Sequence, residues 1–207
     1  DEAIVQRIKT YLDDVSQLLL VDNSEPPTPF LSTIENLDSR IKSIANGVNT
    51  GIAHALNQGV EFGLNGGYNW LLTMDQDSYF EPGAIQAMKH FAAATNPAPG
   101  IISPFHRTPG APSPNFSSST KDLMITMTSG NLLNLRAAKE CGPFDEKLFI
   151  DSVDHDYCLR LRKKGYHIIR VNDAVLNHNL GEIRYRNILG LRIKTSNHSA
   201  TRRYYMT

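Results

Sequence analysis

The chain of 207 residues is long enough to bury a sizeable hydrophobic core in one domain. Apolar residues make up 41% of it and charged residues 20%, as in an ordinary globular protein. Its 21 basic and 21 acidic residues cancel, so no overall field attracts nucleic acid, and we expect no such partner. Two cysteines are too few for a disulfide framework or a zinc cluster, so we expect free thiols in a reducing compartment.

The first half of the chain alternates helix-like and strand-like segments. Apolar residues at helical spacing predict a helix over residues 2–14. Short apolar runs at 18–21, 41–45 and 70–74, each ending at polar residues, predict buried strands. Asn49 is a good cap for a helix that ends at 65–67, and Pro82 is well placed to open another helix, through about residue 94.

The second half is less regular. Residues 95–120 hold six prolines and a Ser/Thr run, which predict a loop around one strand at 100–104. Further strands are expected at 123–126, 129–135 and 166–171, and a helix at 153–164. The last thirty residues are basic and aromatic without a clear period.

This order of elements predicts an α/β fold with a mainly parallel sheet and helices on both faces. Ligands of such sheets bind beyond the carboxyl ends of the strands. Asp22, Asn46 and the pair Asp75 and Asp77 each follow an expected strand, so we expect them along one edge of the sheet.

The segment Asp75-Gln76-Asp77 is the first candidate metal site. Its two carboxylates can face one small volume once the chain leaves strand geometry, and Mg²⁺ or Mn²⁺ bind such oxygens together with substrate phosphate. The alternative is a turn and helix cap before Pro82. The preceding apolar strand favours the metal site.

A second acidic segment, Asp151 to Asp156, precedes or opens the helix expected at 153–164. Asp154 and Asp156 lie about 200° apart around a helix, so both cannot face one site. One can act as a general base while the other caps the helix or pairs with Arg160. Both can equally be ordinary partners of the helix dipole. His178, after the last expected strand, is either a metal or phosphate ligand or a structural histidine.

Together these segments resemble the family 2 inverting glycosyltransferases, which have the GT-A fold. The resemblance rests on seven segments in order over roughly residues 15–180, among them NGVNTGIAHALNQG, TMDQDS, TSGNLLN, GPFDEKLFID and VDHDYCLRLRKKGY. The segments MDQDS and, near the end of the chain, NHSATRRYY further resemble the rhamnosyltransferase branch, which uses dTDP-L-rhamnose.

The resemblance implies one catalytic domain, with a nucleotide-binding part over about 1–95, an acceptor-binding part over about 96–180 and a C-terminal segment over 181–207. It implies a divalent cation, Mg or Mn, a dTDP- or UDP-sugar donor, and a glycan or lipid-linked glycan as acceptor in cell-surface polysaccharide synthesis. We expect a cytoplasmic protein, and peripheral association with the membrane is left open. The implied roles are nucleotide binding for Asp22, Asn46, Asn49 and Asp75; metal binding for Asp75, Asp77 and His178; catalysis for Asp154; acceptor binding for Ser129, Gly130 and Asp151; and diphosphate contact for Arg202 and Arg203.

Two features depart from the family pattern. The family's first strand, which helps to hold the nucleotide base, has no counterpart here, because the chain begins after that point. Val153 stands where many members have Glu. The missing strand leaves open an inactive nucleotide-sugar-binding or scaffold domain. The Asp-X-Asp segment leaves open a phosphatase resembling the haloacid dehalogenases, in which such a segment supplies nucleophile and acid.

Overall fold

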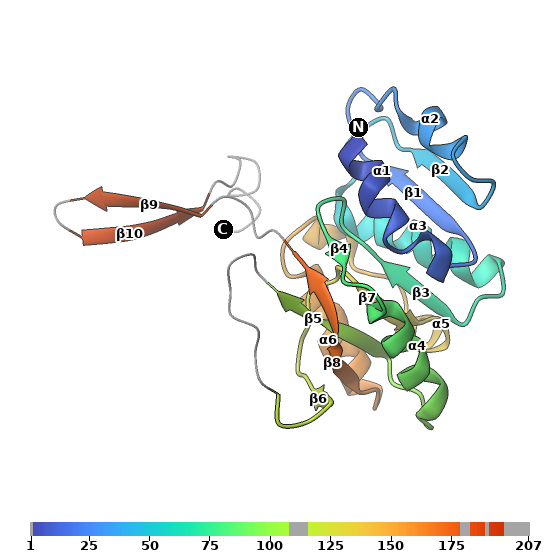
Figure 1. Ribbon diagram of the computed structural model, residues 1–207, viewed down its shortest axis with the longest axis vertical. Helices are drawn as coiled ribbons and strands as arrows, with labels where there is room; N and C mark the ends of the chain where they lie inside the picture. Colours follow the sequence, from blue (N-terminus) through green and yellow to red (C-terminus); the bar gives the residue numbers. More distant parts are fainter. Residues whose placement is uncertain (1, 108–115, 179–182, 189–190, 197–207) are drawn as a thin grey trace.

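The computed structural model describes residues 2–107, 116–178, 183–188 and 191–196. Helices and strands alternate over most of the chain, as expected, and Figure 1 shows their arrangement. The helices are α1 (Glu2–Lys9), α2 (Leu31–Glu35), α3 (Gly51–Asn65), α4 (Ala84–Ala94), α5 (Leu135–Cys141) and α6 (Val153–Lys163), with short 3-10 turns η1 (Leu12–Asp14) and η2 (Glu146–Leu148). The strands are β1 (Leu18–Asp22), β2 (Ile41–Ala45), β3 (Trp70–Thr73), β4 (Tyr79–Phe80), β5 (Ile101–Arg107), β6 (Thr120–Asp122), β7 (Asn131–Asn134), β8 (Ile168–Asn177), β9 (Ile183–Ile188) and β10 (Leu191–Ser196).

The main sheet has six strands in the order β3-β7-β5-β8-β4, with β6 also paired to β8. Only the β5–β8 pair is parallel, whereas the other four pairs are antiparallel. The α/β fold is as expected, but this sheet is mixed rather than mainly parallel. A buried apolar run has the same composition in either direction, so the sequence pattern did not reveal strand direction.

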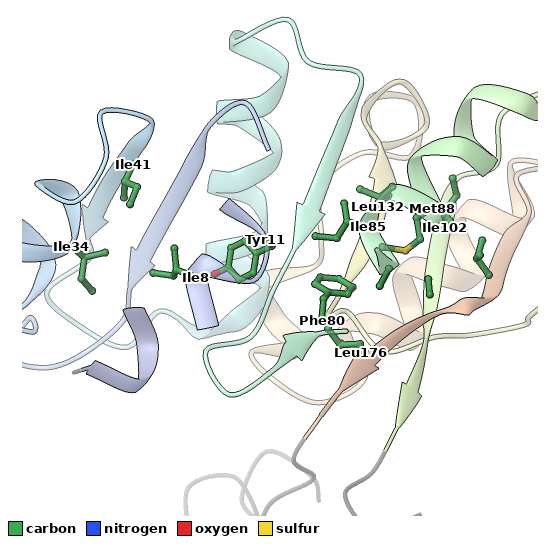
Figure 2. Packing of buried hydrophobic residues seen from close by; sticks show 13 residues of the cluster. Ile8, Tyr11, Ile34, Ile41, Phe80, Ile85, Met88, Ile102, Leu132 and Leu176 are labelled. Atoms are coloured by element: carbon green, nitrogen blue, oxygen red, sulfur yellow. The ribbon is translucent and has the colours of Figure 1, made fainter. Parts of the chain in front are cut away.

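Successive residues of the central strands point to opposite faces of this sheet, and each face has its own core. Ile102 and Leu132 pack with Ile85 and Met88 of α4 on one face, as Figure 2 shows. Their neighbours Ile101 and Leu133 pack on the other face with Ile168 of β8 and Phe144. Helices α3, α5 and α6 supply the other buried members of this cluster: Ala53, Ala137, Ala138, Val153, Tyr157, Cys158 and Leu161. Helices therefore cover both faces, as the alternation of elements predicts.

Strands β1 and β2 form a separate parallel pair with α1 and α2 nearby (Figure 1). Within the described residues, one edge of β1 and the outer edge of β3 have no strand partner. Both strands line one cavity of about 1160 Å³, together with residues of α1, α3 and α4. The cavity therefore lies between the free edges of the two sheets.

Several element boundaries differ from expectation. The helix expected over 2–14 is α1 followed by the turn η1, and the strand expected at 123–126 is replaced by β6 just before it. The apolar run 129–135 divides into β7 and the start of α5, a helix that the sequence analysis missed. Cys158 is buried and Cys141 partly buried, and both are free thiols, as expected. No helix among the described residues has the length and apolar character needed to span a membrane.

Candidate active site

The carboxyl ends of β3 and β8 bring together the three side chains predicted to bind metal. Asp75 and Asp77 follow β3, and His178 follows β8. One ligand atom from each of the three residues lies within 4.8 Å of the other two. The side chain of Asp77 is 45% exposed and that of His178 only 13%, so the cluster is reached from the Asp77 side. Asp75 and Asp77 also line the large cavity.

Two buried hydroxyl groups hold this cluster in place. The Asp75 backbone N–H donates to Ser129 Oγ at 3.2 Å, and Ser129 Oγ donates to Ser78 Oγ at 3.1 Å. Ser78 Oγ in turn lies 2.7 Å from Nδ1 of His178, which fixes the orientation of the imidazole ring. The chain of hydroxyls joins the end of β3 to the end of β8, and partners of this kind orient metal-binding histidines.

The electrostatics of Asp75 fit a cation site. Burial raises the pKa of its carboxyl group; Asp77 and Asp154 raise it further, while His178 and the hydrogen bond with Ser129 oppose the shift. An ionised Asp75 is therefore costly in the protein alone, and a bound cation would offset that cost. Asp154 is one of the charges that act on Asp75, and it lines a small cavity together with Thr73, the last residue of β3.

Asp154 and Asp156 take different roles, as their positions on α6 predict. Asp154 is 25% exposed and accepts hydrogen bonds from the backbone N–H and the ring Nδ1 of His155, both at 2.8 Å. Asp156 forms an ion pair with Arg160 at 2.8 Å. Asp154 also lines a small cavity of about 20 Å³ with Thr128 and other residues. Asp156 does not line that cavity.

Asp22 ends β1 and lies on the same cavity as Asp75. Its carboxylate accepts the backbone N–H groups of Ser24, at 2.9 Å, and Thr28, at 2.7 Å. Burial alone would raise the pKa of Asp22, but these hydrogen bonds lower it below its usual value. Asp22 is thus ionised and shapes the loop after β1, and its predicted contact with the nucleotide remains a prediction.

The two asparagines predicted to bind nucleotide are placed differently. Asn49 lines the cavity, and its Oδ1 accepts the N–H of Gly51 at the start of α3. Asn46 is absent from the cavity lining. Its amide group exchanges hydrogen bonds with Gln58 at 2.9 and 3.1 Å and donates to Asn23 at 2.7 Å. Asn46 therefore joins the loops after β1 and β2 to α3, a supporting role that the sequence did not indicate.

The residues predicted to bind the acceptor differ in burial and in position. Ser129 is only 1% exposed, and its hydroxyl bonds within the protein, so it supports Asp75 instead of presenting a surface to an acceptor. Gly130 has φ +79°, and its N–H donates to the carbonyl of Thr73 at 2.6 Å. Asp151 is partly buried just before α6. Arg202 and Arg203 lie outside the described residues.

Two residues of the site were missed in the sequence. Ser78 is a common turn residue, and its position after an Asp-X-Asp carries no separate signal. The contact of His106 with the site also has no signal in the sequence: its Nε2 lies 2.7 Å from the carbonyl oxygen of Ser129. Burial lowers the pKa of His106, so the neutral ring is favoured there.

The α/β sheet thus ends in an acidic cluster beside a large cavity, an arrangement that can hold a cation together with a phosphorylated ligand. The sequence profile described as "Glycosyl transferase family 2" matches residues 2–132. The chain therefore belongs to glycosyltransferase family 2. This membership leaves the phosphatase alternative without support.

Three similar proteins agree with this assignment. The dTDP-rhamnosyl transferase RfbF of Shigella flexneri is 35% identical over 81 residues, which are 39% of this chain and 26% of the relative. A crystal structure of GalNAc-T7 with UDP, GalNAc and Mn²⁺ superposes with a TM-score of 0.65 at 10% identity, over 79% of this chain and 38% of that one. S. aureus TarS gives a TM-score of 0.66 at 13% identity, over 87% and 35%. The chain thus spans well under half the length of each.

Proposed function

We propose that the protein is an inverting, metal-dependent glycosyltransferase that moves a sugar from a nucleotide diphosphate to an acceptor hydroxyl. The observation that carries the proposal is the cluster of Asp75, Asp77 and His178 beside a cavity of about 1160 Å³. Asp154 lies near it, since it lines a small cavity together with Thr73, the last residue of β3. A transferase of this kind needs a place for the leaving diphosphate and a base for the acceptor, and the two acidic sites supply one each.

The donor set of the cluster suits a divalent cation. Two carboxylates and one imidazole lie close enough for a shared ion, and one raised pKa marks a carboxyl group that gains from a positive neighbour. The imidazole departs from the all-oxygen set that Mg²⁺ prefers, so Mn²⁺ is the first cation to test. A cation held there would neutralise charge on the departing diphosphate.

Asp154 acts on the acceptor in this proposal. Its carboxylate takes the proton of the acceptor hydroxyl while the acceptor oxygen forms a bond to the anomeric carbon. The bond from that carbon to the diphosphate oxygen breaks on the opposite face, and its electron pair leaves with the diphosphate. One displacement of this kind inverts the anomeric configuration. Asp156 cannot replace Asp154, because Arg160 binds its carboxylate.

The donor sugar is proposed from the relatives. RfbF is named as a dTDP-rhamnosyl transferase, and GalNAc-T7 was crystallised with UDP. We propose dTDP-L-rhamnose as the first donor to assay and UDP-sugars as the second, with a glycan or lipid-linked glycan as acceptor. A thermal-shift panel of nucleotide diphosphates with Mn²⁺ would identify the base, because a ligand stabilises by RT ln(1 + [L]/Kd).

Substitution of Asp154 tests the catalytic assignment. Asp154→Asn should lower kcat by roughly 10²–10⁴-fold, the usual worth of a general base, while the Kd for the nucleotide diphosphate stays unchanged. Asp156→Asn is the matched control, because it removes a carboxylate from the same helix turn and should leave kcat within a few-fold. Near-normal turnover by Asp154→Asn would remove Asp154 from the role. Nucleotide binding by the wild type without transfer or donor hydrolysis would instead favour an inactive binding domain.

A further inference from the structure

His178 is held in the cluster by its neighbours at the ends of three strands. Glu81 follows β4, Arg107 ends β5, and Asn177 ends β8 directly before His178. None of the three belongs to the acidic cluster, and none was singled out by the sequence. Their side chains nevertheless contact one another behind it.

The three side chains form a closed triangle of hydrogen bonds. Arg107 Nε donates to Asn177 Oδ1 at 2.9 Å, and Asn177 Nδ2 donates to Glu81 Oε1 at 2.7 Å. An ion pair between Arg107 Nη2 and Glu81 Oε1 closes the triangle. Backbone bonds follow the same path, since the His178 N–H donates to the Arg107 carbonyl at 3.1 Å and the Glu81 N–H to the Val175 carbonyl at 3.0 Å.

The triangle joins the two segments that carry the proposed ligands. Strand β4 pairs with β8 through only two residues, Tyr79 opposite Asn177 and Phe80 opposite Leu176. Asp77 and Ser78 lie immediately before β4, and His178 immediately follows β8. Two residues of pairing fix a strand weakly. The side-chain triangle adds three interactions at this point, so it sets the position of His178 relative to Asp77.

We propose that Glu81, Arg107 and Asn177 are positioning residues for the divalent cation, acting by holding His178 against Asp75 and Asp77. The inference rests on the proposed function in one respect, namely that this cluster binds a cation. Partners outside the ligand set that orient a metal-binding histidine typically contribute 10–100-fold to metal affinity. If the triangle acted on the site only through its charges, substitutions in it would change Mn²⁺ affinity differently.

Substitution of Arg107 separates positioning from electrostatics, because the two predict changes in Mn²⁺ affinity in opposite directions. Arg107→Gln removes a positive charge near a cation site, so electrostatics alone would tighten Mn²⁺ binding. Loss of positioning should weaken it by about 10-fold or more. Arg107→Lys keeps the charge but loses the planar fork that bonds Asn177 and Glu81 together, so positioning predicts weaker binding and electrostatics predicts no change.

The experiment is a titration of the purified chain with Mn²⁺ by calorimetry, together with its unfolding temperature without metal. Arg162→Gln is the matched control, because the Arg162–Asp122 pair has side chains 27% and 42% exposed, against 30% and 41% for Arg107 and Glu81. We expect Arg107→Gln and Arg107→Lys to raise the Kd for Mn²⁺ by about 10-fold or more, and Arg162→Gln to leave it within about twofold.

An unchanged or lower Kd in folded Arg107→Gln would overturn the inference while leaving the metal site intact. Absence of Mn²⁺ binding by the wild type would overturn the metal-dependent part of the proposed function and this inference with it. If Arg107→Gln does not fold, Glu81→Gln takes its place, since it removes the ion pair but keeps an amide oxygen for Asn177. Equal Mn²⁺ affinity of Glu81→Gln and the wild type would then refute the positioning role.

Discussion

Replacement of Asp75 by Asn should have opposite effects on stability in the absence and presence of a cation. The substitution keeps the shape of the side chain and its capacity to bond Ser129 but removes its negative charge. In the protein alone that charge is unfavourable, because burial and the neighbouring Asp77 and Asp154 raise the pKa of Asp75. With a cation bound, the same charge is an attractive partner.

The sign follows from proton linkage. A carboxyl group with a raised pKa in the folded state binds its proton more tightly there than in the unfolded chain. Its contribution to stability therefore falls as pH rises from 3.8, the ordinary pKa of an aspartate, through the raised pKa, and at neutral pH the ionised group is destabilising. Metal-free Asp75→Asn should be more stable than the wild type at pH 7, and this difference should vanish below pH 3.8.

The effect of the cation has a calculable size. A cation at 100 times its Kd stabilises the wild type by about 2.7 kcal/mol. In a chain of 207 residues each kcal/mol shifts Tm by about 2–4 °C, so Mn²⁺ should raise the wild-type Tm by about 5–11 °C. Asp75→Asn should lose most of this shift, so the order of the two Tm values reverses when Mn²⁺ is added.

Scanning fluorimetry from pH 3 to pH 8, with and without Mn²⁺, measures both effects. Asp122→Asn is the control for which the opposite effect is expected. Burial raises the pKa of Asp122, but hydrogen bonds from His167 and Arg162 outweigh it and lower the pKa overall. Removal of the Asp122 carboxylate should therefore destabilise the protein at neutral pH. The Mn²⁺ response of that variant should match the wild type. A full Mn²⁺ shift in Asp75→Asn, or a metal-free Tm below that of the wild type at pH 7, would refute the reasoning.

Three further substitutions test the framework around the site. Gly130→Ala should destabilise by about 2–5 kcal/mol in urea, because φ is +79° and the new Cβ would lie 2.7 Å from Leu176 Cδ2; a loss under about 0.5 kcal/mol would contradict this geometry. Met88→Ala, at a side chain with 0% exposure, should cost about 2–5 kcal/mol in urea and leave the Kd for Mn²⁺ unchanged. Asp22→Ala should cost about 1–3 kcal/mol by leaving two amide donors unpaired, and a cost near zero would show that the loop after β1 does not depend on them.

The sequence predicted the elements whose patterns are local. The strands expected at 18–21, 41–45 and 70–74 correspond to β1, β2 and β3, and the helix expected at 153–164 is α6. Helix α5 was missed because its first residue continues the apolar run of β7. A local signal for it exists, since Asn134 caps the helix by accepting the N–H groups of Arg136 and Ala137. Strand direction has no such local signal.

The residues of the site likewise fall into those with a local signal in the sequence and those without one. Asp75, Asp77 and His178 could be predicted because they lie in the segments that follow two strands, and strand ends define the ligand edge of the sheet. Glu81, Arg107 and Asn177 could not, because their contacts join positions 26, 70 and 96 residues apart. Ser129 was predicted at the site, but its burial behind Asp75 depends on how β7 pairs with β3.

The proposed function requires the donor to contact two sheets at once. The cation ligands come from β3 and β8 of the six-stranded sheet, whereas Asp22 lies at the end of β1 in the separate pair with β2 (Figure 1). No strand among the described residues bridges β1 and β3. Hydrophobic packing and a few hydrogen bonds, such as that from Arg7 to the Gln76 carbonyl at 2.8 Å, relate the two sheets. A nucleotide diphosphate with its base toward Asp22 and its phosphates at Asp75 would link them. We expect a donor bound in this way to couple its binding to the order of the β1–β2 unit, and a cation alone, which contacts one sheet, cannot supply that coupling.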